Sequence, residues 1–352
     1  MKAVIVYTTI YDNRIIEALY ENIEKFDRLK QCSVIVIPDK KTPQSLYERV
    51  KNCKAKGLNI HCPSIKEQES FLNKIGLYPE FVPYNTDNRR NVGFLMALGE
   101  CDVLISIDDD NYPTDSDFVG NHLEPFISSK TYTRVDSARN FYNPMDMLDY
   151  QVSTANVMYP RGYPYKQRQM SEMISETEEK FEIGDIAINA GLWLQDPDID
   201  GITWLVSPAR SERVKGCFKD VVLGPKTWCP VNTQNTSLSA EAAVTYYYIR
   251  MGYSLGGMNI DRYGDMFSGY FAQACAKSLG KSVKFGNPLA VHRRNPHDYY
   301  NDIRSELMGM VVLEAVLERL IKVELSGNDF HDVYESLATW LVECVEREIK
   351  GL

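Results

Sequence analysis

The chain has 352 residues, of which 44% are hydrophobic and 25% are charged, so it holds enough apolar material for a large folded core. Its formal net charge of -9 argues against nucleic-acid binding and against a basic membrane-binding patch, because both need a surface rich in lysine and arginine. No apolar run approaches 18 residues, so we expect no transmembrane helix.

The N-terminus and the cysteines point to a cytoplasmic protein. Residues 1–6 run directly into a strand pattern without an apolar leader, so we expect no signal peptide. The eight cysteines are scattered and none forms a CxxC pair. We therefore predict free, mostly buried thiols in a reducing compartment.

The first 107 residues alternate between short apolar runs, typical of buried strands, and longer segments with helical spacing. This alternation predicts a mostly parallel sheet with right-handed crossovers, in which ligands collect at the carboxyl ends of the strands. The predicted strands are 3–9, 32–38, 80–84 (weak) and 102–107, and the predicted helices are 12–28, 43–56, 64–75 and 90–99.

The remainder of the chain changes character. Residues 111–260 are less regular and rich in Pro, Asn, Tyr and Trp, as expected of a sugar- or acceptor-binding half. A helix is predicted over 264–279. Residues 302–323 and 329–350 predict a C-terminal helical hairpin with Asp329 as an N-cap, and this hairpin is a candidate surface for self-association.

We therefore expect one catalytic domain over residues 1–300, with a nucleotide-binding half (1–115) and a sugar or acceptor half (116–300). Residues 301–352 would form a helical appendage.

Three adjacent carboxylates, Asp108, Asp109 and Asp110, end the last predicted strand. They repel one another and resist burial, and a divalent cation such as Mg²⁺ or Mn²⁺ would relieve this repulsion while bridging two phosphates. A solvated acidic turn is the alternative.

Other polar residues lie at strand ends or at the start of a helix. Asp39 could accept a hydrogen bond from the N3–H of a uracil or thymine ring, or could form a turn or helix cap. Thr8 and Thr9 could offer backbone contacts to the same base. Arg89 or Arg90, at a helix start, could pair with a diphosphate, or could belong to a solvated first turn.

Three later residues are further candidates. His292 could be a metal ligand, and Arg293 beside it could bind phosphate, although a lone histidine is more often structural. Asp265, at the start of a predicted helix, could act as a general base on a hydroxyl group or could cap the helix.

Several of these segments together resemble the reversibly glycosylated polypeptide family, which includes the plant UDP-arabinopyranose mutases. The resemblance covers roughly residues 100–300, in the same order along the chain. The matching pieces are SIDDD (106–110), RGYPY (161–165), GLWL with PDID (191–194 and 197–200), RYGDMFSG (262–269) and SLGKSVKFGNPLAVH (278–292).

The resemblance implies a GT-A-type glycosyltransferase fold, a UDP-sugar and a divalent metal, usually Mn²⁺. It implies that Asp108, Asp109 and Asp110 form the nucleotide-sugar and metal motif and that His292 lies near the metal. It also matches Arg161 to the arginine that becomes sugar-modified or supports the mutase reaction, and Asp265 to an acidic position near the sugar or acceptor.

The chain departs from the family pattern where the sugar or acceptor would be bound. Gly264 stands where the family usually has a second Asp, residues 229–235 replace a Cys-containing segment, and the flank after His292 is more basic.

The sequence thus predicts a metal-dependent glycosyltransferase that uses a nucleotide-diphosphate sugar, with Asp110, His292 and Asp108 as metal ligands. The alternatives are a UDP-sugar pyranose/furanose mutase, which would depend on Arg161, and a non-catalytic partner subunit that stabilises an active paralogue.

Overall fold

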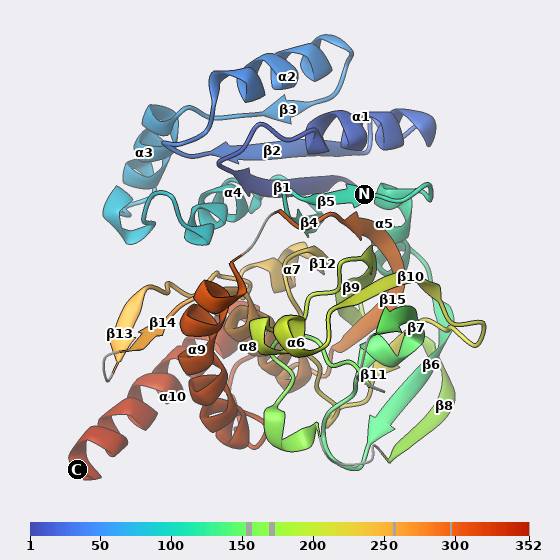
Figure 1. Ribbon diagram of the computed structural model, residues 1–352, viewed down its shortest axis with the longest axis vertical. Coiled ribbons are helices and arrows are strands. Elements are labelled where there is room, and N and C mark those ends of the chain that lie inside the picture. Colours follow the sequence, from blue (N-terminus) through green and yellow to red (C-terminus); the bar gives the residue numbers. More distant parts are fainter. Residues whose placement is uncertain (153–156, 169–172, 256–257, 296–297, 352) are drawn as a thin grey trace.

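A computed structural model gives the fold and describes residues 1–152, 157–168, 173–255, 258–295 and 298–351. Most strands in the described residues belong to one 13-stranded sheet (Figure 1). Its longest series of neighbouring strands has the order β3-β2-β1-β4-β12-β9-β15-β11-β6-β8. Helices flank the sheet and a helical pair ends the chain. The predicted class, a mixed α/β sheet with a C-terminal helical pair, is confirmed.

The N-terminal part of the sheet is entirely parallel. Its alternating side chains separate two cores: Ile5 and Tyr7 pack with α1 and α2, whereas Val4 and Val6 pack with α3 and α4. The elements are β1 (Ala3–Thr9), α1 (Ile15–Lys25), β2 (Cys32–Pro38), α2 (Gln44–Ala55), β3 (Ile60–His61), α3 (Ile65–Lys74), α4 (Arg90–Ala97) and β4 (Val103–Ile107).

The predicted weak strand over 80–84 is wrong. Pro79–Phe81 forms a short 3₁₀ helix, η1, because Pro79 fixes a helical φ at its first position and Pro83 has no N–H for a strand ladder. A second 3₁₀ turn, η2 (Asp87–Arg89), precedes α4.

The segment that looked irregular in sequence supplies most of the remaining strands. They are β5 (Asn111–Pro113), β6 (Lys130–Ser137), β7 (Leu148–Val152), β8 (Ile174–Phe181), β9 (Ile186–Gln195), β10 (Ala209–Val214), β11 (Val221–Leu223), β12 (Asn235–Ser239), β13 (Tyr253–Leu255), β14 (Met258–Ile260) and β15 (Ser282–His292). The helices there are α5 (Phe118–Ile127), η3 (Pro144–Met147), η4 (Tyr165–Gln167), α6 (Gly201–Val206), α7 (Ala240–Ala243) and α8 (Gly264–Ser278).

Two strand pairings join the two parts of the chain. β12 runs antiparallel to β4, with Asn235 opposite Ile107. β15 runs antiparallel to β5, with His292 opposite Asn111. The end of β15 therefore lies beside the turn that follows β4.

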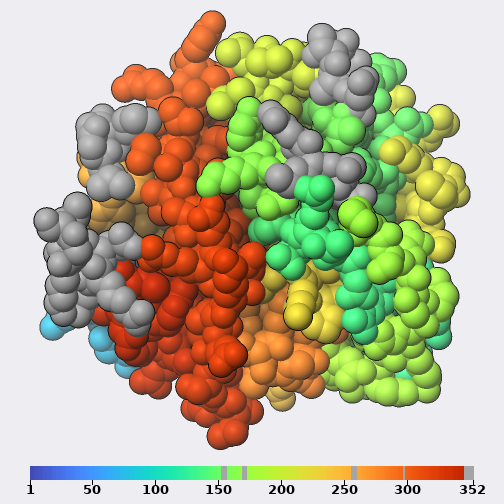
Figure 2. Space-filling model, turned by 90° about the horizontal axis from the view of Figure 1, so that it is seen from below, coloured from blue at the N-terminus to red at the C-terminus, as the bar shows by residue number. Residues whose placement is uncertain are grey.

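The C-terminal pair consists of α9 (Tyr299–Leu320) and α10 (Phe330–Gly351). Its orange and red helices cross the face seen in Figure 2. Buried residues of both helices, such as Leu317 and Val333, join the same core as α8. The Asp329 carboxylate accepts a hydrogen bond from the Asp332 N–H at 3.0 Å, as expected of a cap at the start of α10. Among the described residues, the helices are all too short or too polar to cross a membrane.

Candidate functional site

Two cavities meet beyond the carboxyl ends of β1 and β4, with volumes of about 360 Å³ and 490 Å³. Asp108, Asp110 and Arg262 are among the residues that line both. Of the other predicted residues, Arg161, Asp265 and His292 line the first cavity, and Thr8, Thr9, Arg90 and Asp109 line the second.

Each aspartate of the triplet has a different partner. The Asp108 carboxylate pairs with the buried Arg90 guanidinium at 2.6 Å. The Asp109 carboxylate accepts a hydrogen bond from the Thr9 hydroxyl at 2.5 Å. Burial raises the pKa of Asp109 to about 7, and the two neighbouring carboxylates add to this rise. The triplet is therefore a half-buried, partnered group rather than a fully solvated turn.

Asp110 and His292 form the third pair, with 3.4 Å between Oδ2 and Nε2. The His292 Nδ1 lies 2.6 Å from the Asp196 carbonyl, which can only accept, so Nδ1 carries a hydrogen and Nε2 faces the carboxylate. Burial opposes charge on His292, but Asp110 raises its pKa above the ordinary value. The proton that charges His292 would lie on Nε2, between the imidazole and the Asp110 carboxylate. A divalent cation between the two side chains would take the place of this proton.

The donor set fits a cation that is completed by its substrate. Within the described residues, no three His, Cys, Asp or Glu side chains form a ready metal-binding cluster. Asp110 and His292 supply a carboxylate and an imidazole, while Asp108, the third predicted ligand, is engaged by Arg90. A cation with so few protein ligands relies on phosphate oxygens and water.

Arg161 lies between two buried carboxylates in the wall of the first cavity. Its Nε lies 2.9 Å from Asp198, and its Nη2 lies 2.6 Å from Asp265. Burial lowers the pKa of Arg161, but the two carboxylates outweigh this and hold it well above the ordinary value. Burial also raises the pKa of Asp265. Asp265 does not cap α8, whose N-cap position is Tyr263.

Asp39 and Arg89 line neither cavity. The Asp39 carboxylate accepts hydrogen bonds from the backbone N–H of Lys40 at 2.6 Å and of Asn85 at 2.5 Å. The buried Arg89 guanidinium donates to the Val82 carbonyl at 3.0 Å and to the Gln68 side chain.

Arg293 also lines neither cavity, and its exposed side chain stacks over the Tyr112 ring. Its backbone N–H donates to the Asp110 carbonyl at 2.9 Å.

The residues of the first cavity that were not predicted as site residues include Asp198, Tyr248, Arg262 and Arg294. Asp198 and Arg262 lie inside segments quoted for the family resemblance, but nothing local distinguishes them from surface residues. For Arg294, the sequence did hold an indication. Residues two apart on an extended chain point to the same side, and His292 and Arg294 line the same cavity.

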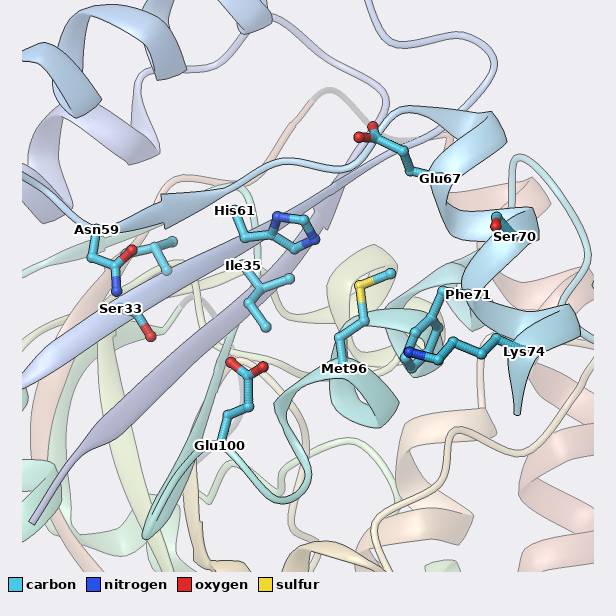
Figure 3. A pocket seen from close by; sticks show the side chains of 11 residues that line it. Ser33, Ile35, Asn59, His61, Glu67, Ser70, Phe71, Lys74, Met96 and Glu100 are labelled. Atoms are coloured by element: carbon cyan, nitrogen blue, oxygen red, sulfur yellow. The ribbon is translucent and has the colours of Figure 1, made fainter. Parts of the chain in front are cut away.

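A further cavity of about 560 Å³ lies beside β2, β3, α3 and α4 (Figure 3). Its polar side chains include His61, Lys74 and Glu100. None of the predicted site residues lines it.

Comparison with known proteins links these features to one family. The sequence profile of the reversibly glycosylated polypeptide family matches residues 13–347. The chain is similar to UDP-arabinopyranose mutase 2 of Arabidopsis thaliana, with 26% identity over 315 residues, covering 80% of each chain. It is also similar to UDP-arabinopyranose mutase 1 of the same plant, with 29% identity over 209 residues; this match covers 52% of the chain and spans about half (53%) of the relative. Probable UDP-arabinopyranose mutase 1 of Solanum tuberosum is 26% identical over 278 residues, covering 70% and 68%.

One solved structure is glucosyl-3-phosphoglycerate synthase from Mycobacterium tuberculosis in complex with Mn²⁺, UDP and phosphoglyceric acid. It is 12% identical and covers 89% of this chain and 78% of its own, at a TM-score of 0.45, which is too low to support an argument about function. The profile match, in contrast, extends over nearly the whole sequence, and the chain therefore belongs to the reversibly glycosylated polypeptide family.

Proposed function

We propose that the chain is an enzyme that binds a UDP-sugar and interconverts its ring forms, as a mutase of the UDP-arabinopyranose type. The observation that carries this proposal is that Arg161 and Asp265 line the same cavity as Asp108, Asp110 and His292. The names of the relatives favour a mutase over glycosyl transfer to a separate acceptor.

The two cavities suggest how the substrate lies. The nucleoside would occupy the second cavity, near Thr8, Thr9 and Asp109, and the sugar would occupy the first, near Arg161 and Asp265. The diphosphate would then lie beside the residues that line both cavities, which include Asp108, Asp110 and Arg262.

Asp110 and His292 would hold a divalent cation, Mn²⁺ or Mg²⁺, together with the diphosphate. When bound, the cation supplies positive charge that neutralises the leaving diphosphate. The protein's own contribution there is to fix the two side chains. The imidazole is held by the hydrogen bond from His292 to the Asp196 carbonyl, and the Asp110 carboxylate accepts a hydrogen bond from the Asn111 side chain at 3.0 Å.

The proposed reaction needs no external acceptor. The bond between the anomeric carbon and the diphosphate oxygen breaks, and its electron pair leaves with the UDP. A different hydroxyl of the sugar then attacks the anomeric carbon and gives up its proton. The bond between the anomeric carbon and the original ring oxygen breaks, and that oxygen keeps the electron pair and takes up the proton. UDP then forms the bond to the anomeric carbon again, so that atoms and charge balance.

The carboxylates around Arg161 suit the charge that this reaction develops. Asp198 and Asp265 would stabilise positive charge at the anomeric carbon. Arg161 would hold both carboxylates in place, because it hydrogen-bonds to each of them through two nitrogens.

Glycosyl transfer to a separate acceptor is the second candidate. Asp265 favours it, because a carboxyl group with a raised pKa can take a proton from an attacking hydroxyl. Such a reaction would release UDP, whereas the mutase returns it to the sugar.

The test is to incubate the purified chain with UDP-, GDP- and dTDP-sugars, with and without Mn²⁺, and to identify products by NMR. A ring-contracted nucleotide sugar without released UDP is the expected result. Free UDP that depends on an acceptor would favour the transferase. Binding without turnover would favour a partner subunit, and the absence of nucleotide binding would remove the whole proposal.

Substituting the two cation-binding side chains gives a sharper prediction. We expect Asp110→Asn and His292→Gln each to weaken Mn²⁺-dependent UDP binding by about tenfold or more. Substituting a residue that holds a metal, or that orients a metal ligand, typically lowers the metal affinity by at least that factor. Isothermal titration calorimetry with and without EDTA measures this. The exposed Asp149→Asn, whose partner is Arg213, is the control. Unchanged Mn²⁺ dependence in both variants would contradict the assignment.

A further inference from the structure

Arg262 differs from the other arginines around the two cavities. Arg90 and Arg161 are paired with carboxylates and almost fully buried, with side chains only 5% and 10% exposed. The Arg262 side chain is 37% exposed. Among the described residues, it is the arginine that lines both cavities. It therefore lies where the proposed substrate would pass from one cavity to the other.

The backbone of Arg262 is held in an unfavourable conformation. Its φ of 56° lies in the left-handed region, which is unfavourable for a residue with a side chain. Hydrogen bonds fix this conformation on both sides. The Arg262 N–H donates to the Asp261 carboxylate at 2.9 Å, and the Arg262 carbonyl accepts from Arg161. Strain that is held this firmly points to a functional position.

Helix α9 fixes the guanidinium from one side. Asp302 lies 3.1 Å from the Arg262 Nη1 and Glu306 lies 3.3 Å from its Nε, and both carboxylates are buried. Both also bind other parts of the chain: Asp302 pairs with Arg294 at 3.2 Å, and Glu306 accepts from the Gly201 N–H at 2.7 Å. The remaining nitrogen, Nη2, makes no hydrogen bond within the described residues.

The charge of the first cavity calls for such a group. Six aspartates line it, against three arginines. All three arginines are paired with carboxylates, but Arg161 and Arg294 are nearly buried, whereas Arg262 is more exposed. A nucleoside diphosphate brings further negative charge. One divalent cation between Asp110 and His292 would leave part of that charge unopposed at the junction, where Arg262 is exposed.

We propose that Arg262 binds the diphosphate of the substrate through Nη2, and that Asp302 and Glu306 of α9 are the residues that position it. This inference rests on the proposed function, because it requires a nucleoside diphosphate in the two cavities. It makes the C-terminal helical pair part of the substrate site.

The experiment compares UDP with uridine, which has no phosphate, in the presence of Mn²⁺. Calorimetry gives the UDP affinity, and ligand-detected NMR at millimolar concentration gives the uridine affinity. Arg262→Gln should weaken UDP binding by about ten- to a hundredfold, as expected for a lost charge-assisted hydrogen bond, with less than a twofold change for uridine. Asp302→Asn should weaken UDP binding in the same direction but less. The exposed Arg304→Gln on the same helix is the matched control and should bind UDP normally.

Two results would overturn the inference while leaving the proposed function intact: wild-type UDP affinity in Arg262→Gln, or equal losses for UDP and uridine. If uridine is too weak to measure, Arg262→Lys decides, because an ammonium group keeps the charge, although not the fork of the guanidinium, and should bind UDP more tightly than the Gln variant does. A Lys variant as weak as the Gln variant would refute the phosphate role. If the unsubstituted chain fails to bind UDP, the proposed function itself fails and this inference with it.

Discussion

Several charged residues of the two cavities are paired before any substrate arrives. Arg90 holds Asp108, Arg161 holds Asp198 and Asp265, and His292 lies against Asp110. Buried charges are tolerated only with such partners, because desolvation costs several kcal/mol for each ion. Pairing also fixes the side chains, so that a substrate enters a site whose charged groups are already oriented.

His122, away from these cavities, gives a pH-dependent prediction. It is buried between Ser237 and Asn235, and burial lowers its pKa to about 3. In the unfolded chain, the His122 imidazole takes up a proton near pH 6.5. The unfolded state therefore binds more protons between pH 6.5 and 3, and stability that is fully present above pH 6.5 is lost as the pH falls.

The expected loss is about 1.4 kcal/mol per pH unit below 6.5, or roughly 2 kcal/mol at pH 5. Urea unfolding at pH 7 and pH 5 should show this additional loss in the unsubstituted chain and not in His122→Gln. The exposed His331→Gln should behave like the unsubstituted chain. Equal pH dependence in His122→Gln and the unsubstituted chain would contradict a neutral buried imidazole.

Residue type and strand position predicted part of the site but not its side-chain partners. The sequence indicates that Asp39 and Asp108 both follow buried strands. The structure shows the Asp39 carboxylate bound to backbone N–H groups, whereas Asp108 lines both cavities. The difference depends on Asn85, which is 46 residues from Asp39. The role predicted for Asp39 in binding a base stays a prediction.

At the scale of elements, local pattern predicted the N-terminal part well. The strands β1, β2 and β4 are mostly apolar and almost fully buried, and the helices between them have regular spacing. Local pattern fails where pairing depends on distant residues. β12 has the sequence NTSLS, which shows no strand periodicity, and it is a strand because it lies between β4 and β9 in the sheet.

Helix α8 carries Asp265 and packs tightly against the segment that leads into β12. A Cβ atom on Gly269 would lie 1.9 Å from the Val231 carbonyl oxygen, so an alanine there would push the two segments apart. We expect Gly269→Ala to reduce the free energy of unfolding by about 1–3 kcal/mol or more. Denaturant titration measures this loss.

Gly216→Ala is the control, because its added Cβ would meet no atom within 4 Å. Its stability should change by about 0.5 kcal/mol at most. If the two variants were equally stable, the close contact between Gly269 of α8 and the Val231 carbonyl would not exclude a side chain at position 269.

At the scale of the whole molecule, the C-terminal helical pair is part of the main core. Leu317 on α9 is 2% exposed, whereas Val311 on the same helix is 54% exposed. We expect Leu317→Ala to lower the free energy of unfolding by about 2–5 kcal/mol and Val311→Ala to change it by about 0.5 kcal/mol at most. Chemical denaturation of both variants tests this, and a similar small effect of both would show that α9 is only loosely attached.

The pairing of β5 with β15 has a consequence for biosynthesis. Asp110 leaves the ribosome long before His292, because translation at about 5–20 residues per second separates them by roughly 10 to 40 s. During this interval Asp110 lacks the imidazole that faces it, and Arg262 lacks the carboxylates of α9. The proposed cation and nucleotide would therefore stabilise the protein only when translation is almost complete, and a nascent chain that stops before α9 would carry the aspartates without the completed cavities.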